Sequence, residues 1–179
     1  MRIISGSHKG RLIRPPAGLK LRPTTDIARE GLFNVLNNIL DYNDLHVLDL
    51  FAGTGSLSYE FASRGAAVVH SVELNARHAA FIISMARKLD LPAIRMFRSD
   101  ARNYLRRTAD IYDLVFADPP YNLEWLIEIP DLVINSGCLR QGGRLILEHP
   151  RDLTFNNHNY FEQHRKYGSV NFTFFRIPD

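Results

Sequence analysis

The segment with the clearest chemical signature is the tetrapeptide Asp118-Pro119-Pro120-Tyr121. Two consecutive prolines donate no backbone N–H and hold the chain extended, so the carbonyl groups beside them are available as acceptors. The carboxylate of Asp118 is a further acceptor, and the ring of Tyr121 offers a flat face on which a base can stack. Such a set suits a planar aromatic amine, because two acceptors can bind both of its N–H bonds.

An exocyclic amino group on a base is a poor nucleophile, because its lone pair is delocalised into the ring. Hydrogen bonds to the Asp118 carboxylate and the Pro119 carbonyl would favour a more tetrahedral nitrogen and aim its lone pair at a methyl donor. The carboxylate could also take or relay the proton that becomes acidic during alkylation. We therefore predict Asp118, Pro119 and Tyr121 as catalytic residues. For an isolated tetrapeptide of this kind, a rigid turn after a strand is the alternative interpretation.

A second set of candidate residues lies at the ends of three expected strands. Asp49 comes near the end of the first strand, and Gly53 and Gly55 occupy the turn that follows it. Glycines permit a tight turn and a close approach of ligand to backbone, and ligands of doubly wound sheets bind outside the carboxyl ends of the strands. Glu73 after the second strand can accept two hydrogen bonds from a ribose diol. Asp100 after the third can reach an adenine amino group or cap the helix that it precedes.

A dinucleotide site is the competing interpretation of the glycine turn. Its G-x-G-x-x-G pattern is incomplete here, because Ser58 stands three residues after Gly55. The carboxylate of Asp49 would also repel a pyrophosphate. S-adenosylmethionine fits better, since it carries a ribose, an adenine and two cationic groups but no phosphate. We therefore predict this cofactor.

The spacing of apolar residues predicts the elements that hold these sites. Strands are expected at 47–50, 68–73, 94–97, 112–117 and 144–148, and helices at about 27–39, 56–63, 76–89, 101–107 and 123–135. Thr25 or Asp26 could cap the first helix and Asn75 the third, whose inward residues would be Ala79, Ala80, Ile82, Ile83 and Ala86, and Pro130 could break the last. Near-continuous apolar strands alternating with helices indicate an α/β fold with a doubly wound, mostly parallel sheet.

The C-terminal part of the chain shows a different pattern. Residues 160–165 and 170–177 read as two strands with no helix between them, joined by a turn at Gly168 and Ser169. An antiparallel hairpin would therefore close the sheet. The cluster Phe172, Phe174 and Phe175, together with Trp125, is expected in the core, because such side chains normally bury large apolar areas. No repeat or linker divides the 179 residues, whose length suits one full-sized core.

The positive charge gathers at the N-terminus. The first 30 residues hold seven cations and two acids, whereas the remaining 149 hold 15 cations and 17 acids. Residues 1–25 are also rich in glycine and proline, which favours hairpin-like or extended turns over a packed subdomain. A basic, turn-rich extension is what contacts to nucleic-acid phosphates require, and a solvated basic surface is the alternative. We divide the chain into this extension and a domain of residues 26–179.

The ordered motifs resemble those of class I S-adenosylmethionine-dependent methyltransferases, and D-P-P-Y resembles their amino-group-methylating subset. The N-terminal segments R-I-I-S-G at 2–6, G-R at 10–11 and R-P-T-T-D at 22–26 resemble the RsmD-like family, which methylates N2 of a guanine in small-subunit (16S) ribosomal RNA. This resemblance implies a Rossmann-like fold and a target amine held by Asp118 and Pro119 with Tyr121 stacking. It also implies cofactor contacts at Asp49, Phe51, Gly53, Gly55, Glu73 and Asp100, and RNA contacts at Arg2, Lys9, Arg11 and Arg22.

Other functions are less well supported by the sequence. The seven histidines show no H-x-x-x-H spacing and the single cysteine, Cys138, has no cysteine partner, so we expect neither a metal nor a disulfide. A DNA amino methyltransferase and a non-catalytic RNA-binding methyltransferase fold are the alternatives. The expected partner is a partly or fully assembled small ribosomal subunit. With no run of about 18 apolar residues and no signal segment, we expect a cytoplasmic monomer.

Overall fold

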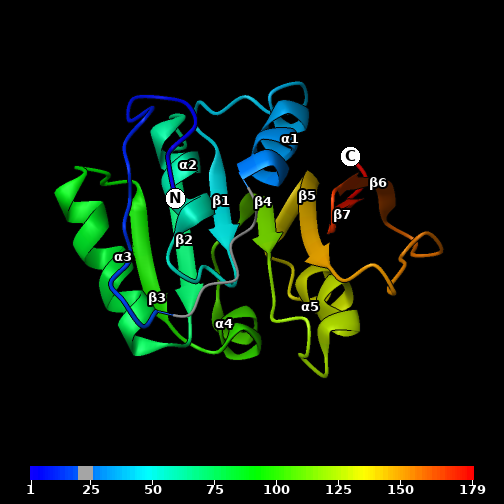
Figure 1. The fold of residues 1–179 in the computed structure, drawn as a ribbon. Coiled ribbons are helices and arrows are strands. Elements are labelled where there is room, and N and C mark those ends of the chain that lie inside the picture. The colour runs from blue at the N-terminus through cyan, green and yellow to red at the C-terminus, as the bar shows by residue number, and fades with distance from the viewer. Residues whose placement is uncertain (20–25) are drawn as a thin grey trace.

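A seven-stranded mixed sheet crosses the molecule in the order β3-β2-β1-β4-β5-β7-β6 (Figure 1). The structure is a computed structural model and describes residues 1–19 and 26–179. Its strands are β1 His46–Asp49, β2 Val68–Glu73, β3 Ile94–Arg98, β4 Tyr112–Ala117, β5 Leu139–His149, β6 Phe161–Tyr167 and β7 Val170–Arg176. Its helices are α1 Asp26–Leu36, α2 Ser56–Ser63, α3 Ala76–Lys88, α4 Ala101–Arg107, the 3₁₀ turn η1 Leu126–Glu128 and α5 Ile129–Asn135. The α/β sheet predicted from the sequence is confirmed.

The topology sets the place of a ligand crevice. Strands β1 to β5 pair in parallel, whereas β7 runs antiparallel to both β5 and β6. Between β1 and β4 the strand order reverses, because β2 and β3 extend the sheet to one side and β5 to the other. Open sheets bind ligands at the carboxyl ends of the strands at such a switch point. Asp49, which ends β1, pairs with Phe116 of β4 at this point.

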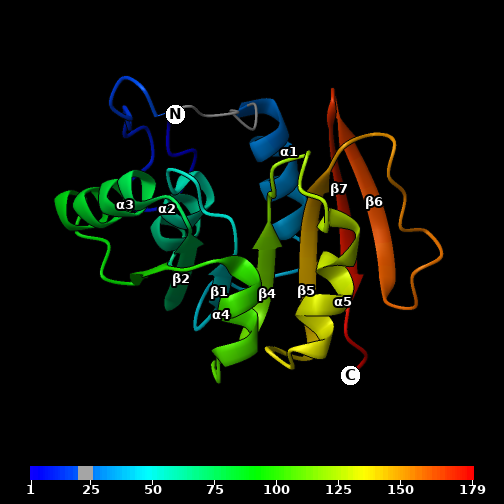
Figure 2. The same cartoon turned by 90° about the horizontal axis from the view of Figure 1, so that it is seen from below.

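Two helical layers cover the sheet (Figures 1 and 2). One core packs α1, α2 and α3 against alternate strand residues such as Val47 and Leu114. The other packs α4, η1 and α5 against their neighbours Leu48 and Val115. Successive strand side chains point to opposite faces, so a strand buried on both faces must be apolar throughout. This is why the strands lack the alternation of polar and apolar residues seen in half-exposed sheets.

Most local signals acted as predicted. The helices at 56–63 and 101–107 and the strands at 68–73 and 112–117 have the expected bounds. The side chain of Asn75 caps α3 by accepting from two backbone N–H groups. Pro130, however, lies in the first turn of α5 rather than breaking a longer helix, because proline in the first turn of a helix forfeits no hydrogen bond. The predicted burial of Ala80 and Ile83 is wrong, since α3 turns only a narrow stripe around Ala79 and Ile82 to the core.

Strand β5 and helix α1 differ from the prediction by several residues. Strand β5 begins at Leu139, five residues before the predicted Arg144, and its pairing with β4 is irregular at Tyr112 and Leu114. Helix α1 ends at Leu36, before the predicted 39. Because the glycines at 142 and 143 interrupt β5, its first residues do not form the apolar run from which a strand is predicted.

The N-terminal residues 1–13 form a small hairpin joined by the bridge between Arg2 and Leu12, as the turn-rich sequence predicts. Ile3 and Ile13 from this hairpin are buried in the core on the α2 side. The carboxylate of Glu60, itself fully buried in α2, accepts from the backbone N–H of residues 4 and 5 at 2.7 and 3.0 Å. We name residues 1–13 the N-terminal hairpin. The predicted cap Thr25 and the predicted RNA contact Arg22 lie outside the described residues.

The C-terminal hairpin of β6 and β7 turns at Gly168 and Ser169, as predicted, and contacts α1. Tyr167 donates a hydrogen bond to the Gly31 carbonyl at 3.0 Å. A Cβ atom at Gly31 would lie 2.3 Å from the Tyr167 ring, so glycine in this helix allows the close approach. In the described ranges, no helix is long and apolar enough to cross a membrane.

Candidate active site

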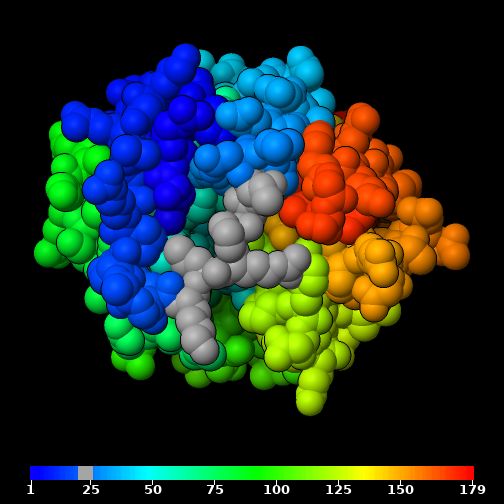
Figure 3. Space-filling model, viewed as in Figure 1, coloured from blue at the N-terminus to red at the C-terminus, as the bar shows by residue number. Residues whose placement is uncertain are grey.

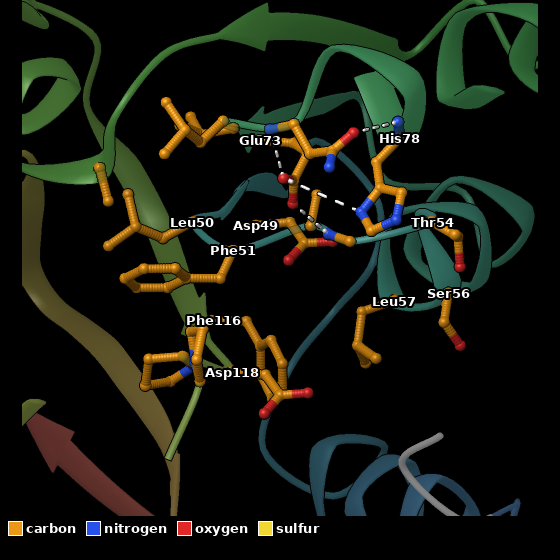
Figure 4. A pocket seen from close by; sticks show the side chains of 18 of the residues that line it. Asp49, Leu50, Phe51, Thr54, Ser56, Leu57, Glu73, His78, Phe116 and Asp118 are labelled. Atoms are coloured by element: carbon orange, nitrogen blue, oxygen red, sulfur yellow. Dashed lines mark hydrogen bonds and ion pairs between the residues drawn. The ribbon is translucent and has the colours of Figure 1, made fainter. Parts of the chain in front are cut away.

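A cavity of about 860 Å³ opens at the carboxyl edge of the sheet (Figure 4). Its wall contains seven of the predicted site residues: Asp49, Phe51, Gly53, Glu73, Asp100, Asp118 and Pro119. They come from the ends of four parallel strands, which the topology brings to one edge. The volume lies within the range usual for small-molecule and cofactor sites. Of the catalytic and cofactor-binding candidates, Gly55 and Tyr121 lie outside the lining of this cavity.

Asp49 is a buried carboxylate in the cavity wall, with 2% of its surface exposed. Ser58 donates to its Oδ2 at 2.5 Å, and the Ser58 hydroxyl also lies 2.8 Å from that of Ser71. Burial raises the pKa of Asp49 to about 6, the Ser58 hydrogen bonds oppose this rise, and the nearby charge of Glu73 adds to it. A bound cation would favour ionisation of this group. The site is therefore electrostatically suited to a positively charged ligand.

Glu73 is fixed by the backbone of two loops. Its Oε2 accepts from the Gly53 N–H at 2.9 Å, and its Oε1 accepts from the Asn75 N–H at 2.7 Å. His78 Nδ1 lies 3.9 Å from Oε1 (Figure 4). A carboxylate has about four acceptor positions, so two backbone bonds leave capacity for the paired hydroxyls of a ribose. The same bonds hold the glycine turn against the end of β2.

The glycine turn depends on its backbone conformation. Gly53 and Gly55 have φ values of 54° and 85°, in the left-handed region that favours glycine. Gly55 also caps α2, and a Cβ atom there would lie 2.8 Å from the Tyr59 ring. Gly55 therefore packs closely against Tyr59 outside the cavity lining, whereas the N–H of Gly53 donates to Glu73.

An aromatic wall closes another part of the cavity. Phe51 and Trp125 both line it, with ring centroids 5.9 Å apart. The guanidinium of Arg102 lies 4.3 Å from the centroid of Trp125 and also bonds Glu128 at 2.7 Å. Phe172, Phe174 and Phe175 are buried, as predicted. Trp125 was predicted in the core, but it is half-buried and faces the cavity as well. Its closeness to D-P-P-Y in the chain was the signal for this position.

Asp100 caps a helix, as one of its two sequence interpretations predicts, and also lines the cavity. Its Oδ1 accepts from the Asn103 N–H at 3.1 Å and so caps α4. The same residue lines the cavity, close in the chain to the lining residue Ala101. The helix cap therefore holds a polar side chain at the cavity wall.

The D-P-P-Y segment follows β4 directly. Asp118 and Pro119 line the cavity, and Figure 4 shows Asp118 beside Phe116 at the end of this strand. Tyr121 instead donates a hydrogen bond to Oε1 of Glu148 at 3.2 Å. Glu148 is 2% exposed and lies at the end of β5. The segment is thus held at both ends, by β4 and by this bond.

The N-terminal part of the chain completes the wall, which the sequence analysis missed. Met1 and Asp26 line the cavity. The buried guanidinium of Arg29 donates to Ser56 Oγ and the Arg2 carbonyl at 2.8 Å and to Asp26 Oδ1 at 2.7 Å. Arg29 thereby joins the N-terminal hairpin, α1 and the start of α2. Only tertiary packing brings these segments together, so no local sequence pattern predicts the hydrogen bonds of Arg29.

The predicted RNA contacts lie on the N-terminal hairpin. Arg2, Lys9 and Arg11 are exposed there, and Arg2 lies 3.8 Å from Glu30. Cys138 is buried. Among residues 1–19 and 26–179, no cluster of three or more histidine, cysteine, aspartate or glutamate side chains could hold a metal ion.

Comparison with known proteins places this site in a family. A family model described as Conserved hypothetical protein 95 matches residues 1–176. The chain is 34% identical over 148 residues to Ribosomal RNA small subunit methyltransferase D of Escherichia coli (strain K12), covering 83% of this chain and 74% of that one. It is also 34% identical over 157 residues to YlbH of Bacillus subtilis (strain 168), covering 86% and 84%. The solved structure of yhhF from Escherichia coli superposes with a TM-score of 0.86 at 30% identity, covering 99% and 98%.

The chain belongs to the RsmD-like family of methyltransferases. The resemblance stated from the sequence is thereby confirmed, and with it S-adenosylmethionine as the methyl donor. The cavity of this RsmD-like methyltransferase fits that cofactor. Buried Asp49 suits its cationic groups, Glu73 has acceptor capacity for its ribose, and the aromatic wall suits its adenine.

Proposed function

We propose that this methyltransferase transfers a methyl group from S-adenosylmethionine to N2 of a guanine in small-subunit ribosomal RNA. One observation carries the proposal: the Asp118-Pro119 pair of acceptors lines the same cavity as Asp49 and Glu73. An amine held by the first pair would face a methyl donor held by the second. The name of the Escherichia coli relative supports ribosomal RNA as the substrate.

The cofactor-binding residues would act by holding and orienting. Bound S-adenosylmethionine supplies a methyl group on a sulfonium, which is a good leaving group. We assign its cationic end to Asp49 and its ribose to Glu73, and its adenine to Asp100 with Phe51 as an apolar wall. Gly53 and Gly55 give the turn the shape that allows this approach. Each contact uses a group that the fold already holds in place, so little ordering cost remains at binding.

The D-P-P-Y residues would act on the target base. Asp118 and the Pro119 carbonyl would accept the two N–H bonds of the guanine amine, and Tyr121 would stack on the ring. The new N–C bond forms as the S–C bond breaks, and the S–C electron pair stays on sulfur. The proton lost from the nitrogen passes to Asp118 or through it to water. The main role of these residues would be to orient the lone pair of the guanine amine toward the methyl group.

Residues 1–25 would form the RNA-binding part and residues 26–179 the methyltransferase domain. Arg2, Lys9 and Arg11 are exposed for contacts with phosphates, and we assign Arg22 the same role. The substrate's own fold would supply much of the specificity, because this basic region is small. We therefore propose a monomeric cytoplasmic enzyme that acts on an assembled or partly assembled small ribosomal subunit.

Methyl transfer from labelled S-adenosylmethionine tests the proposal. The substrates are small ribosomal subunits that lack the modification, the same RNA freed of protein, and duplex DNA, each followed by nucleoside mass analysis. Label in N2-methylguanosine is the expected result, with the particle favoured over naked RNA. Label only in DNA would instead make the chain a DNA amino methyltransferase. Tight cofactor binding without transfer to any of the three would make it a non-catalytic RNA-binding fold.

A further inference from the structure

A second basic feature lies at the end of the C-terminal hairpin, outside the N-terminal extension. Arg165 and Lys166 are adjacent, exposed and close to the turn at Gly168. We name these two residues the hairpin-tip pair. They belong to β6, the edge strand of the sheet, and lie outside the lining of the candidate active site.

The strand register places this pair at the same sheet edge as the cavity. Strand β6 runs antiparallel to β7, and β7 antiparallel to β5, so β6 ends where β5 ends. Arg165 pairs with Phe172, and Phe172 pairs with Glu148. Two strand spacings therefore separate Arg165 from Glu148, or about 10 Å. Glu148 in turn bonds Tyr121 of the candidate active site.

The hairpin-tip pair and the N-terminal hairpin lie on opposite sides of the β4 end. Figure 2 shows the N-terminal residues above α2 and α3, and the β6–β7 turn beyond β5. Figure 3 shows both segments on one face, the first in dark blue and the second in orange-red. In sheet order, β4 with its D-P-P-Y extension stands between β1 and β5. A strand of RNA that placed a base at Asp118 could thus meet cations in both directions.

The local charges leave this pair available to an anion. Within the described ranges, no carboxylate lies within 4 Å of the cationic groups of Arg165 or Lys166. The neighbouring acid Glu162 is held by Arg144 at 2.9 Å, and Arg165 Nε donates to the uncharged side chain of Gln163. The strand is also firmly placed, because Tyr167 bonds α1 through Gly31. Cations on a rigid element fix the register of a bound nucleic acid.

We propose that the hairpin-tip pair binds backbone phosphates of the RNA substrate on the side of the target nucleotide opposite the N-terminal hairpin. The inference rests on the proposed function and extends it: two basic surfaces flank the cavity and hold the strand across it. Arg165 and Lys166 lie on opposite faces of their strand, so they would contact successive phosphates around the hairpin end. Phosphate contacts of this kind set position and carry no base specificity.

Salt-dependent RNA binding tests the inference. Three double variants remove two cations each while keeping long side chains: Arg165→Gln with Lys166→Gln, Lys9→Gln with Arg11→Gln, and Arg87→Gln with Lys88→Gln. The last is the matched control, because these exposed residues end α3 near the amino ends of the parallel strands, whereas the cavity lies at their carboxyl ends. The probe is unmodified small-subunit ribosomal RNA, naked and in the subunit. The affinity for S-adenosylhomocysteine and the melting temperature check the fold of each variant.

The expected result is an RNA dissociation constant about tenfold higher for the hairpin-tip variant, with a slope of log K against log salt flatter by about 1.5. The α3 variant should keep the wild-type slope, and cofactor affinity should be unchanged in all three. A wild-type slope for the hairpin-tip variant, alongside a flattened slope for the Lys9 and Arg11 variant, would overturn this inference and leave the proposed function standing. If the wild-type chain bound neither RNA, the proposed function and the inference would both fall.

Discussion

The hydroxyl of Tyr121 donates to the buried carboxylate of Glu148 across 3.2 Å, which links the loop after β4 to the end of β5. The last paired residues of these strands are Ala117 and Leu147, so Glu148 directly follows the paired part of β5, whereas Tyr121 lies in the loop beyond β4. The bond restricts the plane of the Tyr121 ring. A ring offered to a base for stacking gains from this restriction, because its orientation is set before the base arrives.

Changes at Tyr121 should separate the ring from its hydroxyl. Tyr121→Phe keeps the stacking face and loses one hydrogen bond, so we expect kcat to fall about fivefold. Tyr121→Ala loses the face as well and should lower kcat by about 50-fold or more. Single-turnover methylation of the ribosomal substrate measures both. Equal losses in the two variants would show that the ring contributes nothing beyond its hydroxyl.

Replacement of Asp118 should affect chemistry more than cofactor binding. We expect Asp118→Ala to lower the rate of methyl transfer by roughly 100-fold or more, because the carboxylate acts mainly in the transition state. The dissociation constant for S-adenosylhomocysteine, measured by calorimetry, should stay within about threefold of wild type. Asp118→Asn, which preserves shape, is the control for packing. A parallel loss of affinity and rate would place Asp118 in the cofactor site instead.

The buried carboxylate of Asp49 should make cofactor binding pH-dependent. Its pKa is about 6 without a ligand, and a nearby cation favours the ionised form. Binding of S-adenosylmethionine should therefore release a proton near pH 6, and affinity should rise up to tenfold per pH unit below that value and level off above it. Calorimetry in buffers of different ionisation enthalpy measures the release. Asp49→Asn should remove the pH dependence, and its persistence would assign the titration elsewhere.

The same pKa shift has a consequence for stability. Because the pKa of Asp49 is raised from 3.8 to about 6 on folding, the folded chain binds more protons than the unfolded chain between these values. Its stabilising contribution is complete below about pH 4 and is lost as the pH rises through 6. Asp49→Asn should consequently raise the melting temperature by a few degrees at pH 7.5 and by less at pH 4.5. A larger gain at the lower pH would contradict the assignment.

Gly31 should resist a substitution that usually stabilises helices. Glycine to alanine in a helix interior normally gains about 1 kcal/mol. Here the new methyl group would overlap the Tyr167 ring, so we expect Gly31→Ala to lower the free energy of unfolding by about 1–2 kcal/mol. Adding Tyr167→Ala should make the glycine substitution favourable, as a double-mutant cycle in urea would measure. An additive cycle would show that the two residues do not interact.

The single tryptophan should report on the cavity. Trp125 lines the cavity and its ring also contacts the Arg102 guanidinium, so binding of S-adenosylhomocysteine should change its fluorescence. Trp125→Leu should remove the signal and weaken binding about three- to tenfold, measured by calorimetry. Unchanged fluorescence at saturating ligand would place the adenine away from this wall.

Local signals predicted the parts of the site that local backbone rules determine. Gly53 and Gly55 mark a turn because of their φ values, and Asn75 and Asp100 cap helices with their own side chains. Strand ends then meet at one edge because parallel sheets require it. The contact of Arg29 with Ser56 joins residues 27 positions apart and depends on how α1 packs. Such contacts produce no periodic pattern in the sequence. For the same reason, the sequence did not predict that Met1 lines the cavity.

Arg29 links the N-terminal hairpin to the cavity rim through hydrogen bonds. Arg29 is 1% exposed, and its guanidinium has acceptors in three segments: the Arg2 carbonyl, Asp26 and Ser56. If the N-terminal hairpin moved away, the buried guanidinium of Arg29 would lose one of its acceptors. The free-energy cost of that loss is well above the cost of losing an exposed contact. These segments should therefore open as one cooperative unit, with similar amide-exchange protection in all three. If the N-terminal hairpin binds RNA as proposed, RNA binding there and cofactor binding in the cavity should be energetically coupled, so that each ligand tightens the binding of the other.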